Sequence, residues 1–141
     1  NKTRSLNSEI CGIHIFYDFY IQYYTRLYYL EDKMILGLRN HAEISELAKY
    51  GFNELKNINW NISYYLGTGI GLEQEEFPVI DPGNFTKFKE NMIISLHPQT
   101  YSDKGFGLII KDTICITGSN YIIFTDSSRN EEKLLERKID L

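Results

Sequence analysis

The chain has few cysteines and prolines and only one tryptophan among its 141 residues. Its two cysteines, Cys11 and Cys115, lie within apolar runs and show no CxxC spacing. This placement predicts buried thiols rather than a disulfide or a metal site. It also fits a reducing compartment, so we expect the protein in the cytoplasm.

Long apolar runs and an excess of positive charge are absent as well. No segment approaches the roughly 20 apolar residues that a membrane span requires. Fifteen basic residues against nineteen acidic residues give a formal charge of -4. This charge supplies no positive field for nucleic acid or for an anionic membrane. The sequence therefore predicts neither a nucleic-acid partner nor a membrane partner.

Aliphatic and aromatic residues, in contrast, are abundant. Hydrophobic residues make up 43% of the chain, and eleven tyrosines and eight phenylalanines contribute most of the 14% that is aromatic. Such a composition excludes a disordered chain and favours β-strands. The length suits one compact domain or part of one.

The N-terminal third contains two different patterns. From Ile10 to Leu30 the chain is rich in β-branched and aromatic residues, which predicts two antiparallel strands with a turn at Asp18. Apolar residues then recur at helical spacing over residues 31–56. This pattern predicts an amphipathic helix with a break near Asn40.

The C-terminal half contains turn signals between apolar segments. "DPGN" at 81–84 and "GSN" at 118–120 both predict turns. Three strands are predicted around them, at residues 91–98, 105–117 and 121–125. The charged tail from Asp126 predicts a short terminal helix or a loose end.

Four segments in a fixed order carry a family resemblance. They are a strand hairpin ending in "TR", then "LGTGIGLEQEEFP", "ENMIISLHP" and "GLIIKDTICIT". This order resembles the C-terminal half of the creatinase and aminopeptidase P family, the M24 metallopeptidases with the pita-bread fold. The resemblance implies an α+β fold over residues 9–125, a curved antiparallel sheet packed with helix. Residues 1–8 would then be a linker or an upstream remnant, and residues 126–141 a C-terminal tail.

The family's metal ligands do not recur at three matching positions. In the family, two Asp, one His and two Glu side chains hold two divalent metals. Here the histidine of the glycine motif is replaced by Thr68, the glutamate before the proline by His97, and the bridging glutamate by Lys111. Downstream of the glycine motif, a histidine that contacts substrate in the family is replaced by Glu75, and the next acid, Glu76, is kept.

Upstream, the resemblance depends on "YYTR", which keeps Thr25 and Arg26 of the family motif. With this alignment the second aspartate falls on Tyr23. The first aspartate falls near His14 if the hairpin is about two residues shorter than usual. The resemblance therefore implies that all five ligand positions are changed.

Two divalent cations need anionic oxygen ligands to offset their charge. Threonine, lysine and tyrosine do not replace a histidine and two carboxylates, and the ammonium of Lys111 would repel the cations. The sequence therefore predicts no dinuclear metal centre and no cofactor. A single ion held by His14 and His97, joined by Glu75 or Glu76, is a weaker alternative.

Three functions stay open at this point. The first is a non-catalytic domain that binds a peptide or protein in or beside the cleft. The second is a creatinase-like, metal-free hydrolase of a C–N bond in a small molecule, with His14 or His97 as the base beside Glu75 or Glu76. The third is an active metallo-aminopeptidase, which the ligand changes disfavour.

The remaining candidate site residues would line the cleft, and several also have an ordinary structural interpretation. Thr68 suits a turn between glycines, and Lys111 suits a solvated strand. His97 before a proline suits a structural histidine bonded to the backbone. The residues expected to face a ligand in the cleft are Tyr23, Thr68, Lys111 and Arg26.

The family domain contains two similar αβ halves, and only the second is recognisable here. An isolated half would expose a sheet face that otherwise packs against its twin. We therefore expect an upstream half-domain or a partner chain, an oligomeric state, and a small molecule or peptide in the cleft.

Overall fold

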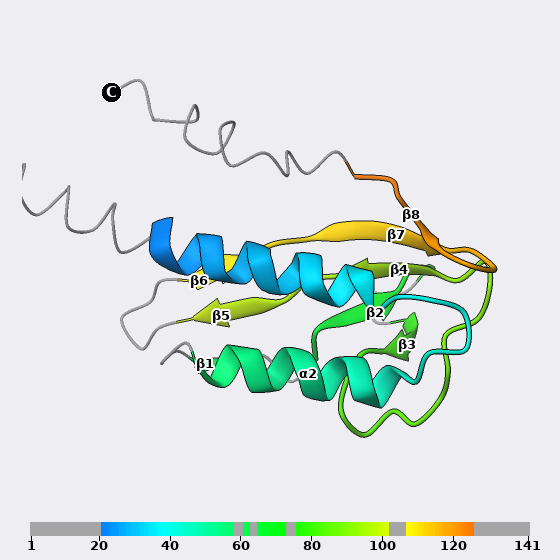
Figure 1. Cartoon of the computed structure of the whole chain (residues 1–141), viewed down its shortest axis with the longest axis horizontal. Coiled ribbons are helices and arrows are strands. Elements are labelled where there is room, and N and C mark those ends of the chain that lie inside the picture. Colours follow the sequence, from blue (N-terminus) through cyan, green and yellow to red (C-terminus); the bar gives the residue numbers. More distant parts are fainter. Residues whose placement is uncertain (1–20, 58–60, 63–64, 73–75, 102–106, 126–141) are drawn as a thin grey trace, which may run out of the picture.

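A computed structural model of the chain describes residues 21–57, 61–62, 65–72, 76–101 and 107–125. In these residues two helices lie in front of a layer of antiparallel strands (Figure 1). The α+β class and the antiparallel sheet predicted from the sequence are confirmed.

The first helix is described over residues 21–36. Buried side chains recur along it every three or four residues, at Leu27, Leu30 and Met34, which is the period of a helix face. The prediction of two antiparallel strands from Ile10 to Leu30 is therefore wrong over residues 21–30, and residues 10–20 lie outside the described residues. Tyrosine and isoleucine favour strands locally, but burial of one helical face in the core outweighs that preference.

Residues 37–43 separate the two helices, which confirms the break predicted near Asn40. In this turn His41 has a positive φ of 70°. Its N–H donates to the Phe88 carbonyl at 2.9 Å, and the Phe88 N–H donates to the Ala42 carbonyl at 2.9 Å. These bonds connect the turn to the loop that precedes strand β4 (Ile93–Leu96).

The second helix, α2 (Ile44–Lys56), packs closely against the first helix. At Gly51 an added Cβ would lie 2.9 Å from Met34 Sδ and 2.4 Å from Leu66 Cδ1. These distances are shorter than van der Waals contact, so only glycine allows this approach. The two helices and Leu66, the residue before strand β2 (Gly67–Gly69), therefore meet in one core.

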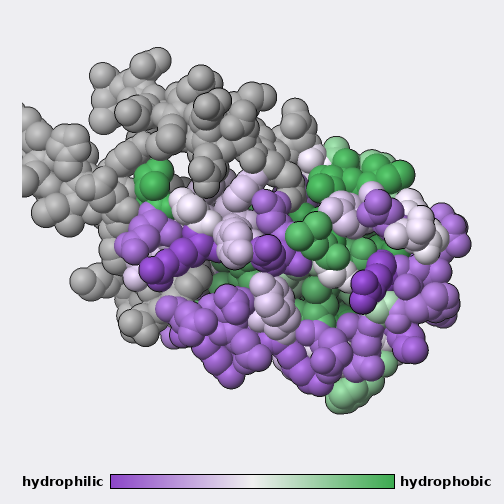
Figure 2. Space-filling model, viewed as in Figure 1, coloured by the Kyte–Doolittle hydropathy of each residue, from purple (hydrophilic) through white to green (hydrophobic). Residues whose placement is uncertain are grey.

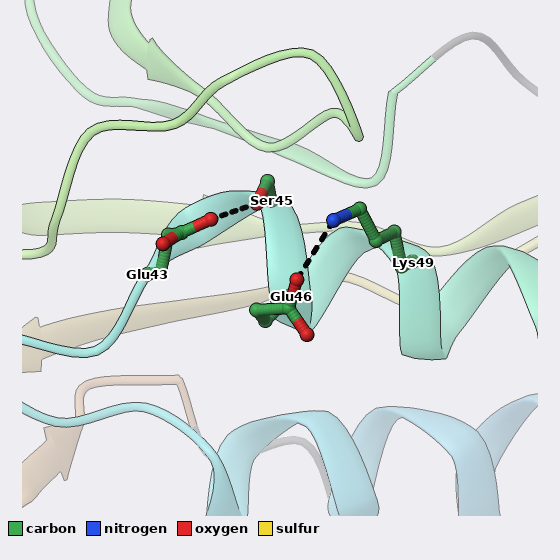
Figure 3. Close-up of polar contacts among 4 residues, drawn as sticks. All are labelled: Glu43, Ser45, Glu46 and Lys49. Carbon is green, nitrogen blue, oxygen red and sulfur yellow. Dashed lines mark hydrogen bonds and ion pairs between the residues drawn. The ribbon is translucent and has the colours of Figure 1, made fainter.

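The opposite side of α2 is polar. On this side Lys49 Nζ lies 2.7 Å from the Glu46 carboxylate (Figure 3). At the start of the helix, the buried Ser45 hydroxyl donates to the Glu43 carboxylate. A space-filling view of the same side shows hydrophilic side chains over much of the surface, with apolar side chains visible between them (Figure 2). The helix is therefore amphipathic, as its sequence predicts.

The described residues contain eight strands in two antiparallel sheets. The larger sheet has the order β3-β2-β4-β7-β8, and the smaller has the order β1-β5-β6. The strands are β1 (Asn61–Ile62), β2 (Gly67–Gly69), β3 (Glu76–Val79), β4 (Ile93–Leu96), β5 (Gln99–Tyr101), β6 (Gly107–Ile109), β7 (Asp112–Ile116) and β8 (Tyr121–Ile123). The turn predicted at 118–120 is confirmed, because Ile116 pairs with Tyr121 across it.

The strand predicted at 91–98 contains β4 of the larger sheet, and the chain then enters the smaller sheet as β5, beyond the predicted range. The strand predicted at 105–117 is divided between the two sheets, because it contains both β6 and β7. The Ile110 N–H donates to the Pro98 carbonyl at 3.3 Å, so the two crossing points lie side by side. A proline has no N–H for a ladder, which suits a position between two sheets.

The larger sheet has two different faces. Its core face carries aliphatic side chains that share one buried cluster with both helices: Ile94, Leu96, Ile114 and Ile116. Since side chains alternate along a strand, the intervening residues point away from the helices. We call this side the outer face, and it includes Thr68, Ser95, Thr113 and Cys115.

Candidate functional site

Three hydroxyl side chains form a row across the outer face. Thr68 on β2 pairs with Ser95 on β4, and Ser95 pairs with Thr113 on β7. Neighbouring strands are about 4.8 Å apart, so residues paired in this way have adjacent side chains. Thr68 is 5% exposed and Ser95 is 4% exposed, whereas Thr113 is partly exposed.

His97 and Lys111 stand at one end of this row, where the chain crosses between the sheets. Leu96 at the end of β4 pairs with Asp112 at the start of β7, so the residues just beyond them are neighbours. The His97 N–H donates to the Leu66 carbonyl at 2.8 Å. The structure thus brings together Thr68, His97 and Lys111, the three positions at which the resemblance implies metal ligands in the family.

The environment of His97 favours its neutral form. Burial lowers the pKa of His97 most, and the Lys111 ammonium lowers it further, while a backbone hydrogen bond acts in the opposite direction. The imidazole also makes an edge-to-face contact with Tyr65, with ring centroids 5.5 Å apart. His97 is therefore held by its backbone and by an aromatic neighbour, and the side chain of Lys111 is exposed.

The glycine motif serves close backbone packing. An added Cβ at Gly69 would lie 2.2 Å from the Phe77 carbonyl oxygen, and at Gly71 it would lie 2.4 Å from the Glu76 carboxyl group. The pairing of β2 with β3 shifts register at this point. These glycines let two strands approach at a bulge, and no ligand is needed to explain them.

Glu76 lies away from His97 along the sheet. Gly69 pairs with Glu76, whereas Leu66 accepts the backbone bond of His97. Three residues of extended strand span about 10 Å of backbone, and the Glu76 carboxyl group lies against Gly71, still farther from Leu66 along the chain. The structure therefore does not bring His97 and Glu76 together as a base and its partner. Two other predicted site residues, His14 and Glu75, lie outside the described residues.

Tyr23 and Arg26 belong to the first helix. The prediction of a strand that ends in "TR" is wrong, because Thr25 and Arg26 are exposed helical residues. Tyr23 packs partly buried against the core. Arg26 lines a cavity of about 640 Å³ whose other walls include Glu54 of α2. The structure thus places Arg26 beside the two helices and not in the strand cluster.

Ser95 is a further candidate site residue that the sequence patterns did not indicate. Its hydroxyl is buried and has no hydrogen-bond partner among the described residues. The available signal was its position two residues before His97, because alternation puts both on one face of a strand. The family resemblance indicated only ligand positions, and Ser95 is not one of them.

The donor set of this cluster is unusual for a metal site. Among the described residues it offers one imidazole, three hydroxyls and an ammonium, and no carboxylate. Across the described part of the chain, no three His, Cys, Asp or Glu side chains are grouped as a metal site requires. These residues do not fit a dinuclear centre, which needs anionic ligands.

The fold is that of the pita-bread peptidases. The X-Pro aminopeptidase of Thermotoga maritima superposes with a TM-score of 0.70 at 20% identity, over 76% of this chain and 31% of that chain. A prolidase from Pyrococcus furiosus gives 0.66 at 27% identity, over 74% of this chain and 32% of that chain. The chain therefore has an α+β fold similar to part of these structures.

The chain belongs to metallopeptidase family M24, whose profile matches residues 13–118. A Xaa-Pro dipeptidase of Pyrococcus horikoshii is 35% identical over 83 residues, which make up 59% of this chain and 22% of that protein. A Xaa-Pro dipeptidase of P. furiosus is 39% identical over 83 residues, with the same coverage. The chain spans about a fifth of the length of these relatives. Neither helix, within the described ranges, is long and apolar enough to cross a membrane.

Proposed function

We propose that this M24 domain lacks the family's dinuclear metal site and binds a peptide or protein without cleaving it. The observation that carries the proposal is the grouping of Thr68, His97 and Lys111 at the crossing of the two sheets. These are the positions at which the resemblance implies a histidine and two glutamate ligands.

Electrostatics at this position supports the loss of metal. No carboxylate of the described residues pairs with Lys111, so its positive charge is not neutralised there. Two like charges about 4 Å apart repel by several kcal/mol when they are partly shielded from water. A divalent cation would meet this repulsion and gain only one imidazole ligand. The site therefore disfavours the cations on which catalysis in the family depends.

The outer face also offers apolar surface for a partner. Ile93, Cys115 and Ile122 pair across β4, β7 and β8 on this face. Ile93 is 41% exposed and Ile122 is 52% exposed. Exposed apolar rows next to polar groups are typical of surfaces that bind other chains. We propose on this basis that the domain works with a partner chain or a further half-domain.

A metal-free, creatinase-like hydrolase is the second candidate. The lowered pKa of His97 favours it, because a neutral imidazole accepts a proton at neutral pH. The separation of His97 from Glu76 counts against it. The proposed function therefore keeps His97 as a binding group.

The test combines peptide binding with turnover. The 141-residue chain is incubated with a library of Xaa-Pro and other short peptides, with added Mn²⁺ and separately with EDTA. We expect binding that EDTA does not change, and no cleaved product by mass spectrometry. Metal-dependent cleavage would overturn the proposal, and metal-independent cleavage lost in His97→Gln would establish the second candidate.

A further inference from the structure

The polar cluster on the outer face is built from hydrogen-bond donors. Its members are Thr68, Ser95, His97, Lys111 and Thr113. Hydroxyls donate one hydrogen bond each, and an ammonium donates up to three and accepts none. No carboxylate of the described residues is among the causes that shift the pKa of His97. Within the described ranges, every side chain of the cluster can therefore donate a hydrogen bond, and no carboxylate pairs with its one positive charge.

One of these donors lacks a partner. Ser95 Oγ is buried, with the residue 4% exposed, and no group in the described residues bonds to it. A buried hydroxyl without a partner is costly, so such groups in folded proteins are usually satisfied. The hydroxyls of Thr68 and Thr113 lie on either side of it in the strand register. An acceptor that reached this row would supply the missing partner of the Ser95 O–H.

Exposure changes along the cluster in a way that suits a ligand. Lys111 is exposed, His97 and Thr113 are partly exposed, and Ser95 and Thr68 are buried. A ligand approaching from solvent meets the positive charge first and the hydroxyls last. Hydrogen bonds from an ammonium to an anionic oxygen are shorter and stronger than those between neutral groups.

We propose that Thr68, Ser95, His97, Lys111 and Thr113 form a binding site for a compact oxyanion, namely a carboxylate or a phosphate group. The inference deepens the proposed function, on which it rests, because it names the ligand group that this same site binds. The anion accepts hydrogen bonds from Lys111 and from the row of hydroxyls. It lies at the position where the resemblance implies that active relatives hold their cations. The site has thus exchanged cation binding for anion binding.

The experiment compares three small probes by titration into the ¹⁵N-labelled chain, followed by NMR. Acetate and inorganic phosphate carry the two oxyanions, and acetamide is the neutral isostere of acetate. We expect acetate or phosphate to shift the amide signals of residues 95–97 and 111–113, with acetamide causing no saturable shift. Tighter binding of acetate assigns a carboxylate ligand, and tighter binding of phosphate assigns a phosphate ligand.

Two variants test the residues. Lys111→Met keeps the aliphatic stem and removes the charge, and we expect affinity to fall about tenfold, or roughly 1.4 kcal/mol. Ser95→Ala removes the unpartnered hydroxyl, and we expect a loss of about threefold with folding preserved. The matched control is Lys89→Met, an exposed lysine before the other end of β4, which should leave the affinity unchanged.

Two results would overturn the oxyanion site. One is equal binding of acetamide and acetate, and the other is an affinity that Lys111→Met leaves unchanged. Neither result affects the proposed function, which is decided separately by peptide binding and turnover. Conversely, metal-dependent cleavage with intact acetate binding would overturn the proposed function and leave the oxyanion site standing.

Discussion

The core face and the outer face of the larger sheet obey different constraints, although the same strands build both. On β7, Ile114 and Ile116 are fully buried against the helices, while Thr113 and Cys115, which alternate with them, point outward. The core face needs apolar volume at fixed positions, because loss of that volume leaves cavities. The outer face has no such requirement. A family fold can therefore persist while the chemistry on its outer face changes.

The largest effect is expected from a cavity on the core face. Ile114→Ala removes a fully buried side chain and should lower the free energy of unfolding by about 2–5 kcal/mol. Thr113→Ala, its neighbour on the outer face, should change that free energy by less than about 1 kcal/mol. Urea denaturation followed by circular dichroism measures both. Equal losses would show that the two faces do not differ as described.

The next effect is expected at the glycine bulge. Gly69→Ala places a Cβ 2.2 Å from the Phe77 carbonyl oxygen, a backbone atom that cannot move aside cheaply. The unfolding free energy should fall by about 1–3 kcal/mol. At Gly107 the nearest atom to an added Cβ is 3.7 Å away, so Gly107→Ala should cause no loss. Similar stability of both variants would contradict the packing role of the motif.

A smaller effect is expected from two hydroxyls with different partners. Ser95→Ala removes an unpartnered group and should leave stability unchanged or raise it by up to about 1 kcal/mol. Thr125→Val removes a donor to the buried carboxylate of Asp112 and should cost about 1–3 kcal/mol. Thermal denaturation separates the cases. A clear loss in Ser95→Ala would show that its hydroxyl has a partner in the folded chain.

The smallest effect is a pH dependence from His97. Its folded pKa is lowered from the ordinary value of 6.5, so the unfolded chain binds more protons as the pH falls through that value. Stability contributed by the neutral imidazole is therefore present above about pH 6.5 and is lost as the pH falls toward the folded pKa. His97→Gln should flatten the part of the stability curve that lies below about pH 6.5.

The control for that titration is the exposed His41, which lies in the turn between the helices. His41→Gln should leave the His97 component of the curve intact. Lys111→Met should reduce the component without removing it, because burial is the larger cause. An unchanged curve in His97→Gln would rule out the lowered pKa.

Sequence patterns predicted those parts of the fold that depend on local periodicity. The helical spacing of residues 44–56 gave α2, and the alternation around Ile114 gave the two faces of β7. The glycine motif indicated the correct family. Each of its glycines lies against backbone or side-chain atoms of a neighbouring segment, which explains why the fold needs glycine there. The family motifs, aligned through these glycines, indicated the positions of Thr68, His97 and Lys111.

Other parts depend on contacts between distant segments and could not be predicted. Residues 21–30 have the composition of a strand, yet Leu27 and Leu30 pack in the core as a helix. Because of this error Arg26 was expected in the cleft, whereas it lines a cavity beside α2. At His97 and Lys111 the chain crosses between the two sheets, because both sheets are built from the same chain segments. The sequence of one segment alone does not show such a crossing. Ser95 became a candidate only when its burial was known.

The central claim is that this M24 domain does not hold a dinuclear metal centre. The direct measurement is metal content by inductively coupled plasma mass spectrometry, after the chain is equilibrated with Mn²⁺, Co²⁺ or Zn²⁺ and passed through a desalting column. The donor set of Thr68, His97 and Lys111 predicts well under one equivalent of each metal per chain. Retention of two equivalents, lost on mutation of these residues, would contradict the account.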